Sequence, residues 1–184
     1  MMSFQLIQNR ISELVNNSSA TVADYLAAAK GLSGAGETPA YFRKIRAAFL
    51  SSYTVQGLPE VFRARAIFHN LSAEVYNAPY AQISQEILNS ESGLYKFAPD
   101  VIYILAEQKD FLSDGHLEEL VRVLREKTKA WIVPSIFRDP SDALRMTGVV
   151  AGHSEVGRRI SNFDFNYFLN KIGREEHWYT KYKD

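Results

Sequence analysis

The hydroxyl side chains that end the first apolar segment of the chain are the best candidates for chemistry. The near-continuous apolar run 45–52 closes on Ser51 and Ser52, and Tyr53 and Thr54 follow directly. Such a run is typical of a strand buried on both faces of a parallel sheet. Strands of this kind deliver the next residues to the carboxyl edge of the sheet, where ligands bind. A serine there can act as a nucleophile, and the N-terminus of the following helix can stabilise an oxyanion or a phosphate.

A serine nucleophile needs a general base, which is normally histidine. Of the four histidines, His153 is expected in a loop near the carboxyl edge and is the best candidate base for Ser51. His69 and His116 are expected at helix ends, and His177 near the C-terminus. The alternatives are structural. Small hydroxyl side chains often only finish a strand and satisfy backbone groups, and a loop histidine is often merely solvated.

A second polar block, Asn-Ala-Pro-Tyr-Ala-Gln at 77–82, is expected at the same edge because it follows the strand predicted at 72–76. Tyr80 and Gln82 can donate hydrogen bonds to a ligand, and Pro79 restricts the loop. The candidate ligand-binding residues are therefore Ser52, Thr54, Tyr80 and Gln82.

The N-terminal part of the chain predicts a helical hairpin over 1–36. Apolar residues at helical spacing favour a helix over 3–16, and Thr21 can cap a second helix. The glycine-rich run 31–36 is expected to end that second helix. We expect the hairpin to cover the α/β domain of residues 37–184 or to pair with another chain.

From residue 45 onward, strands and helices alternate, which predicts an α/β fold with a parallel sheet between two helical layers. This three-layer αβα arrangement is flavodoxin-like or SGNH-hydrolase-like. The predicted strands are 45–52, 72–76, 101–106, 130–133 (stopped by Pro134) and 159–163. The predicted helices are 58–69, 80–88, one capped by Asp114, 141–150 and 164–172; residues 92–95 are predicted to form a turn.

Composition narrows the functional classes. The chain has 184 residues, of which 46% are hydrophobic and 23% charged, as in one globular domain. Lys plus Arg equals Asp plus Glu at 21 each, so no basic field attracts nucleic acid. The absence of cysteine excludes disulfides, thiolate metal sites and a cysteine nucleophile. No metal-ligand spacing, glycine-rich phosphate loop, signal peptide or membrane-spanning window occurs. We expect a cytoplasmic protein with no metal, cofactor, nucleic acid or membrane partner.

The position of Ser51 is similar to that of the nucleophile in SGNH hydrolases, but the motifs of that family are absent. Ser51 follows Phe-Leu, not Gly-Asp, and the strand at 101–106 does not continue into Gly-x-Asn-Asp. No Asp-x-x-His occurs near the C-terminus. These absences argue against autonomous hydrolysis, since a fold does not carry a function by itself.

Four short motifs resemble the N-terminal α/β domain of FkbH-like proteins, subgroup IIIC of the HAD-type phosphatases. They are Leu-Ser-x-Tyr-Thr at 50–54, Tyr-Asn-x-x-Tyr at 76–80, Ser-x-Leu-Tyr at 92–95 and Pro-Asp-Val at 99–101. The resemblance implies proteins that load phosphorylated three-carbon (glyceryl) acyl units onto acyl carrier proteins in polyketide or related biosynthesis. The segment 164–184 resembles the one that precedes their phosphatase domain. The Asp-Leu-Asp-x-Thr-Leu-Trp motif of that domain is absent from this chain.

Three functions follow as hypotheses. The first is an accessory, non-catalytic module whose partner is an acyl carrier protein or a downstream HAD-type phosphatase domain. The second is a serine acyl-hydrolase or acyltransferase of SGNH type, with Ser51 as nucleophile and His153 as base. The third is an interaction module that dimerises through the N-terminal hairpin.

Overall fold

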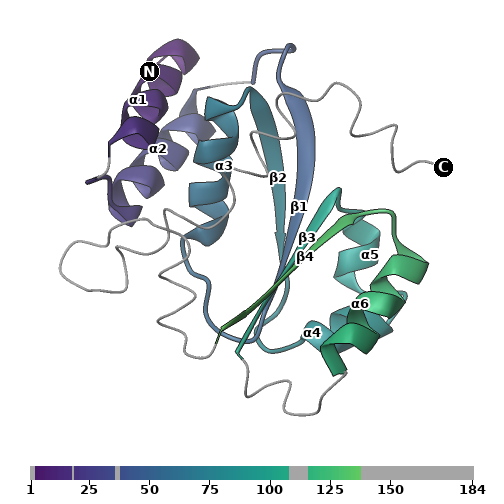
Figure 1. Ribbon diagram of the computed structural model, residues 1–184. Helices are drawn as coiled ribbons and strands as arrows, with labels where there is room; N and C mark the ends of the chain where they lie inside the picture. The colour runs from purple at the N-terminus through teal and green to yellow at the C-terminus, as the bar shows by residue number, and fades with distance from the viewer. Residues whose placement is uncertain (1–2, 18, 36–37, 108–115, 138–184) are drawn as a thin grey trace.

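The computed structural model describes residues 3–17, 19–35, 38–107 and 116–137 (Figure 1). These residues form a parallel sheet of four strands, in the order β2-β1-β3-β4, between two layers of helices. The predicted three-layer α/β fold is confirmed. The elements in chain order are α1 (Phe4–Asn16), α2 (Val22–Gly34), β1 (Arg43–Ser51), α3 (Leu58–Phe68), β2 (Leu71–Asn77), α4 (Ile83–Leu88), α5 (Gly93–Phe97), β3 (Val101–Glu107), α6 (His116–Lys127) and β4 (Trp131–Phe137).

Strand β1 lies at the centre of the fold and is buried on both faces, as its apolar run predicts. Phe49 packs into the cluster formed with α1, α2 and α3, whereas Leu50 packs into the cluster formed with α4, α5 and α6. Both side chains are completely buried. Because successive side chains of a strand point to opposite faces, one strand anchors both helical layers.

The N-terminal hairpin packs on the outside of α3 (Figure 1). The hydroxyl of Tyr25 in α2 donates a hydrogen bond to the carbonyl oxygen of Leu14 in α1 (3.3 Å). The same hydroxyl accepts from the buried guanidinium of Arg65 in α3 (3.4 Å). One buried tyrosine therefore joins α1, α2 and α3.

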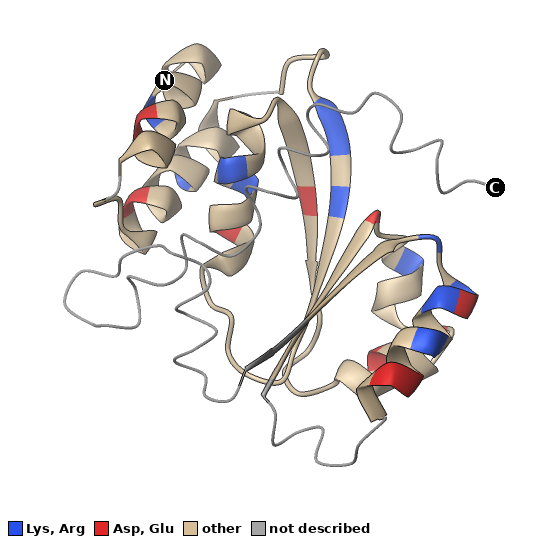
Figure 2. Cartoon of the chain, in the orientation of Figure 1, with Lys and Arg blue, Asp and Glu red and all other residues tan. Residues whose placement is uncertain are grey.

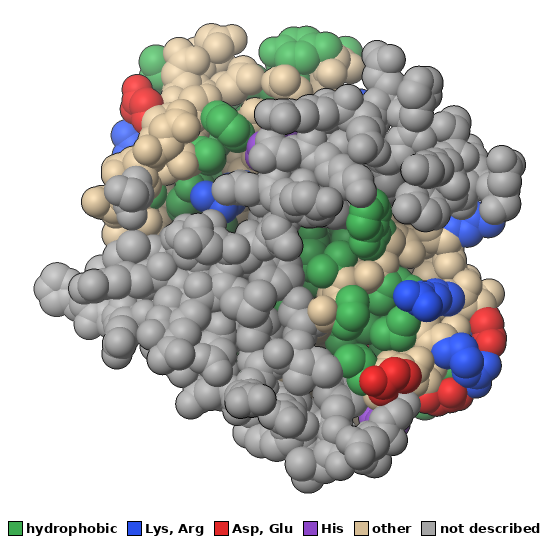
Figure 3. Space-filling view, viewed as in Figure 1, with side chains coloured by type: hydrophobic (Ala, Val, Ile, Leu, Met, Phe, Trp, Pro, Cys, Tyr) green, Lys and Arg blue, Asp and Glu red, His purple; other side chains and the backbone are tan. Residues whose placement is uncertain are grey.

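The opposite layer exposes charge on its outer side. Leu120 and Leu124 of α6 are buried against the sheet, whereas Arg122 lies on the exposed side between Glu119 and Glu126. Acidic and basic side chains accordingly lie side by side over α6 at the molecular surface (Figures 2 and 3). This is the amphipathic pattern of a helix that covers a sheet.

Several boundaries differ from the sequence-based expectation for physical reasons. Helix α2 continues through Gly31 to Gly34, with Gly31 close to Ile7 of α1. Residues 92–95, predicted to be a turn, instead enter the short helix α5. Strand β4 continues through Pro134, which is tolerated because β4 is the edge strand of the described sheet.

Two expectations about the helix predicted at 80–88 are also wrong. Helix α4 begins only at Ile83. Ala81 has a left-handed backbone conformation (φ 56°), which does not fit into a right-handed α-helix. The apolar residues of the predicted helix, Ile83, Ile87 and Leu88, are expected to face the core; Ile83 and Ile87 are buried, but Leu88 is 55% exposed. The cap at Asp114, the elements predicted at 141–150, 159–163 and 164–172, and His153 and His177 lie outside the described residues.

None of the helices in the described ranges has both the length and the apolar character that crossing a bilayer requires.

Replacing Thr21 by alanine is expected to lower the free energy of unfolding by about 1 kcal/mol at neutral pH. Thr21 caps α2 as predicted: its Oγ1 accepts from the Asp24 N–H (3.3 Å), and the Asp24 carboxylate accepts from the Thr21 N–H (2.8 Å). The Thr21 hydroxyl also donates to the Asp24 carboxylate (2.7 Å), and this bond, with the one from the Thr21 N–H, lowers the pKa of Asp24 below its ordinary 3.8. The stability that the ionised Asp24 carboxylate contributes through the cap is therefore present above about pH 4. It is lost as the pH falls through the folded-state pKa of Asp24.

Urea unfolding at neutral pH and at about pH 2 measures this effect, with the exposed Ser19→Ala as control. The difference between Thr21→Ala and the wild type should shrink in acid. A difference that stays constant or grows in acid would show that Asp24 does not contribute through the cap.

Candidate functional site

The turn after β1 uses the hydroxyl of Ser51 internally. Ser51 Oγ donates to the carbonyl oxygen of Tyr53 (2.6 Å) and accepts from the N–H of Tyr53 (3.1 Å). Ser51 is buried, and the N–H of Ser52 donates to the carbonyl oxygen of Leu105 in β3 (3.0 Å). The only proton of the Ser51 hydroxyl is thus committed to the backbone, so the serine braces the turn.

The loop after β2 is fastened to the end of β1. The N–H of Ala78 donates to the carbonyl oxygen of Phe49 (2.9 Å), and the N–H of Ala81 donates to that of Ser51 (3.1 Å). Ala81 is held in the left-handed conformation, which is unfavourable for a residue with a Cβ atom. Such a conformation persists only where the surrounding contacts impose it, so this loop has a fixed shape.

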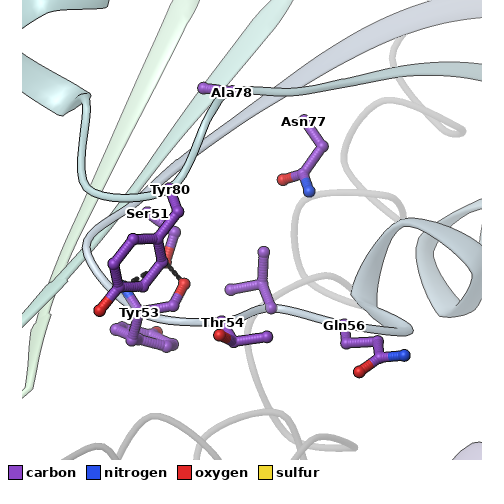
Figure 4. A pocket seen from close by; sticks show the side chains of 8 residues that line it. Ser51, Tyr53, Thr54, Gln56, Asn77, Ala78 and Tyr80 are labelled. Atoms are coloured by element: carbon purple, nitrogen blue, oxygen red, sulfur yellow. Dashed lines mark hydrogen bonds between the residues drawn. The ribbon is translucent and has the colours of Figure 1, made fainter.

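The two loops enclose an open pocket of about 290 Å³ at the carboxyl edge of the sheet (Figure 4). Tyr53 and Tyr80 lie at one end of the view, and Gln56 and Asn77 at the other. Tyr80 is 69% exposed, so its ring stands at the mouth of the pocket. The lining residues are Ser51, Tyr53, Thr54, Val55, Gln56, Asn77, Ala78 and Tyr80.

The structure brings together part of the predicted site. Ser51, Thr54 and Tyr80 line the pocket. Ser52 and Gln82 belong to the same two loops but do not line it. The proposed base His153 lies outside the described residues. Sequence reasoning did not single out Tyr53, Gln56 and Asn77 as ligand contacts. The signal was present, because all three occur in the same two polar loops that follow adjacent parallel strands.

Among the described residues, the pocket walls carry no formal charge. Neither 51–57 nor 77–82 contains an acidic or basic residue. In Figure 2, neither loop shows the red or blue that marks charged residues. Helix α3 begins just after Gln56, with Gly57 in a left-handed conformation (φ 84°) that favours glycine. Its first turn contains Pro59, which has no N–H, and the carboxylate of Glu60. Both features weaken this helix end as a site for an anion.

A serine and a histidine meet elsewhere, in the layer of α4 and α6. Ser84 Oγ lies 3.4 Å from Nε2 of His116, and both side chains are partly buried. The sequence places His116 at a helix end, and it is the first residue of α6. Neither residue lines the pocket of Ser51.

No group of three or more His, Asp or Glu side chains in the described ranges is placed to hold a metal ion.

Comparison with known proteins supports the fold. No protein-family model and no curated protein matches the chain. A similar solved structure is the N-terminal part of protein BF1531 from Bacteroides fragilis, which contains a phosphatase domain and was determined in complex with Mg. The TM-score is 0.52 at 20% sequence identity, over 84% of this chain and 42% of that chain. At this identity the likeness establishes a shared α/β fold, and this chain spans less than half of the solved structure.

Replacing Ser51 by alanine is expected to lower the free energy of unfolding by about 1–2 kcal/mol, because the N–H and carbonyl of Tyr53 lose their partner. Urea unfolding followed by circular dichroism measures the change. The exposed Thr54→Ala in the same turn is the matched control and should stay within about 0.5 kcal/mol of the wild type. Equal stabilities for Ser51→Ala and the wild type would contradict a bracing role for Ser51.

Proposed function

We propose that this chain is an accessory, non-catalytic module of the FkbH-like type. It would hold an acyl carrier protein, or the acyl group that the carrier bears, for a HAD-type phosphatase domain that acts on a phosphorylated three-carbon unit. The lack of cysteine fits action in a reducing cytoplasm.

One observation carries the proposal: the motifs that resemble FkbH-like proteins coincide with the walls of the pocket. Ser51, Tyr53 and Thr54 belong to the Leu-Ser-x-Tyr-Thr motif, and Asn77 and Tyr80 to the Tyr-Asn-x-x-Tyr motif. These two motifs come from different parts of the chain and meet only in the folded protein. The likeness to a solved protein part that contains a phosphatase domain adds support at the level of the fold.

The geometry of Ser51 supports a role without turnover. A nucleophilic serine must pass its proton to a base as it attacks. Here the proton is directed at the carbonyl oxygen of Tyr53, which is not a base at neutral pH. Ser51 lines the pocket but is only 5% exposed, so little of its surface is open to an acyl group.

The test is binding of purified acyl carrier protein, in its apo and holo forms, to the immobilised chain. We expect saturable binding of the carrier and no hydrolysis of p-nitrophenyl acetate or p-nitrophenyl phosphate. Tyr80→Ala should weaken binding, because Tyr80 is exposed at the pocket mouth. Leu88→Ala, at another exposed apolar side chain on α4, is the matched control. Failure of both carrier forms to bind would refute the proposal.

The location of Ser51 at the end of the central strand also favours the second candidate, a serine acyl-hydrolase or acyltransferase. A fluorophosphonate probe with mass mapping of the adduct decides between the two. The accessory role predicts no adduct on the folded protein. An adduct on Ser51 that disappears in Ser51→Ala would establish that Ser51 is an activated nucleophile. An adduct on Ser84 would instead show that the serine beside His116 is the activated one.

A further inference from the structure

We propose that the pocket between the 51–57 and 77–82 loops binds a neutral chain that carries amide groups, and that it discriminates against phosphate. The inference rests on the proposed function, since the carrier protein presents its acyl group on a pantetheine arm of this chemistry. Beyond that function, the inference names the pantetheine arm as the part of the loaded carrier that the pocket recognises.

The charge of the pocket excludes a strong anion site among the described residues. Each lining side chain in the described part of the chain is uncharged. Recognition of phosphate normally uses Arg or Lys, or several N–H groups at a helix N-terminus. The start of α3, which follows the 51–57 loop, offers Pro59 in place of one N–H and the carboxylate of Glu60 in its first turn. A phosphate bound there would meet a like charge and too few donors.

The hydrogen-bonding groups of the pocket match an amide. The Gln56 and Asn77 side chains each offer two N–H donors and a carbonyl acceptor, and both residues are exposed. An amide on the ligand also has one donor and one acceptor, so it can pair with either side chain in both directions. The rings of Tyr53 and Tyr80 lie at the opposite end in Figure 4 and offer flat apolar surface to methylene groups between the amides.

The pocket is preformed and small. The two backbone hydrogen bonds from Ala78 and Ala81 to β1 hold one wall in place, and the Ser51 turn holds the other. A fixed site saves the ordering cost that binding otherwise imposes. Its volume of about 290 Å³ suits a segment of an extended chain and is small for a dinucleotide.

The test is titration of the ¹⁵N-labelled chain with reduced pantetheine, with inorganic phosphate as the competing probe at matched ionic strength. Pantetheine should shift the amide signals of Thr54, Gln56, Asn77 and Tyr80 in a saturable way, and phosphate should not. Asn77→Ala should weaken pantetheine binding about tenfold, the effect of one good hydrogen bond. Leu88→Ala, outside the pocket, should leave the affinity unchanged.

A charge-introducing variant tests the discrimination directly. Gln56 is exposed, so Gln56→Lys should fold normally, gain a response to phosphate and lose part of its affinity for pantetheine. Signals of the wild type that move with phosphate at these same residues would overturn the inference, and so would a spectrum that pantetheine leaves unchanged.

Failure of the inference is distinguishable from failure of the proposed function. Equal binding of apo and holo carrier, with no response to pantetheine, would retain the accessory role and refute the pocket assignment. Binding of pantetheine without binding of either carrier form would support the pocket assignment and refute the accessory role.

Discussion

Replacing Phe62 by alanine is expected to lower the free energy of unfolding by about 3–5 kcal/mol. Phe62 of α3 is completely buried, with its ring centroid 5.6 Å from that of Phe49 and 5.9 Å from that of Tyr103. The Phe49 and Tyr103 rings stack at 5.0 Å across the neighbouring strands β1 and β3. Alanine would remove the third ring and leave a cavity between α3 and the two central strands.

Urea unfolding followed by circular dichroism and by tyrosine fluorescence measures the loss. Phe62→Leu, which keeps most of the volume, should cost clearly less than Phe62→Ala. Tyr41→Ala removes an aromatic ring that is 65% exposed and should stay within about 0.5 kcal/mol of the wild type. A Phe62→Ala variant as stable as Tyr41→Ala would show that α3 does not depend on this aromatic cluster.

Replacing Gly93 by alanine is expected to destabilise the protein by about 2–3 kcal/mol through overpacking. A Cβ atom on Gly93 would lie 2.7 Å from Cζ of Tyr76 and closer still to its hydroxyl oxygen. The ring cannot move freely, because it stacks on Phe97 (5.6 Å) and its hydroxyl donates to the Glu86 carboxylate (3.1 Å). Burial and this hydrogen bond raise the pKa of Tyr76 to about 12, so the hydroxyl keeps its proton at neutral pH.

Thermal and urea unfolding of a double-mutant cycle locate the clash. Tyr76→Phe removes the nearest atom, so Gly93→Ala should cost less in that background than in the wild type. Gly34→Ala is the matched control, because no atom lies within 4 Å of its would-be Cβ and alanine favours a helix. Identical costs of Gly93→Ala in the two backgrounds would mean that Tyr76 is not the obstacle.

These two variants also bear on the site, because the clusters they disturb hold its strands. Phe49 lies two positions before Ser51, and its carbonyl oxygen accepts the hydrogen bond that fastens the loop after β2. Tyr76 lies directly before Asn77 in the pocket wall. We therefore expect the pocket to lose its shape in variants that loosen either helical layer.

The prediction of the elements succeeded where local patterns are sufficient. The amphipathic spacing of α1, the Thr21 cap of α2 and the apolar run of β1 each depend on residues close together in the sequence. The predicted boundaries of elements were wrong where contacts with distant residues set them. Ala81 adopts its left-handed conformation while its N–H bonds to Ser51, thirty residues earlier by numbering, and Pro134 is tolerated only because its strand lies at an edge.

The sequence by itself determined the α/β class, the burial of β1 on both faces and the carboxyl edge as the position of two polar loops. The alternation of strand and helix patterns along the chain and the apolar run of β1 are local features of the sequence. The carboxyl ends of parallel strands meet at one edge of the sheet, so the loops that follow them lie there. Only the tertiary structure decided that Tyr53, Gln56 and Asn77 join Thr54 and Tyr80 in one pocket, and that the Ser51 hydroxyl is directed at Tyr53. Hydrogen-bond partners and pocket walls depend on three-dimensional distances between loops, which the spacing of residues along a chain does not specify.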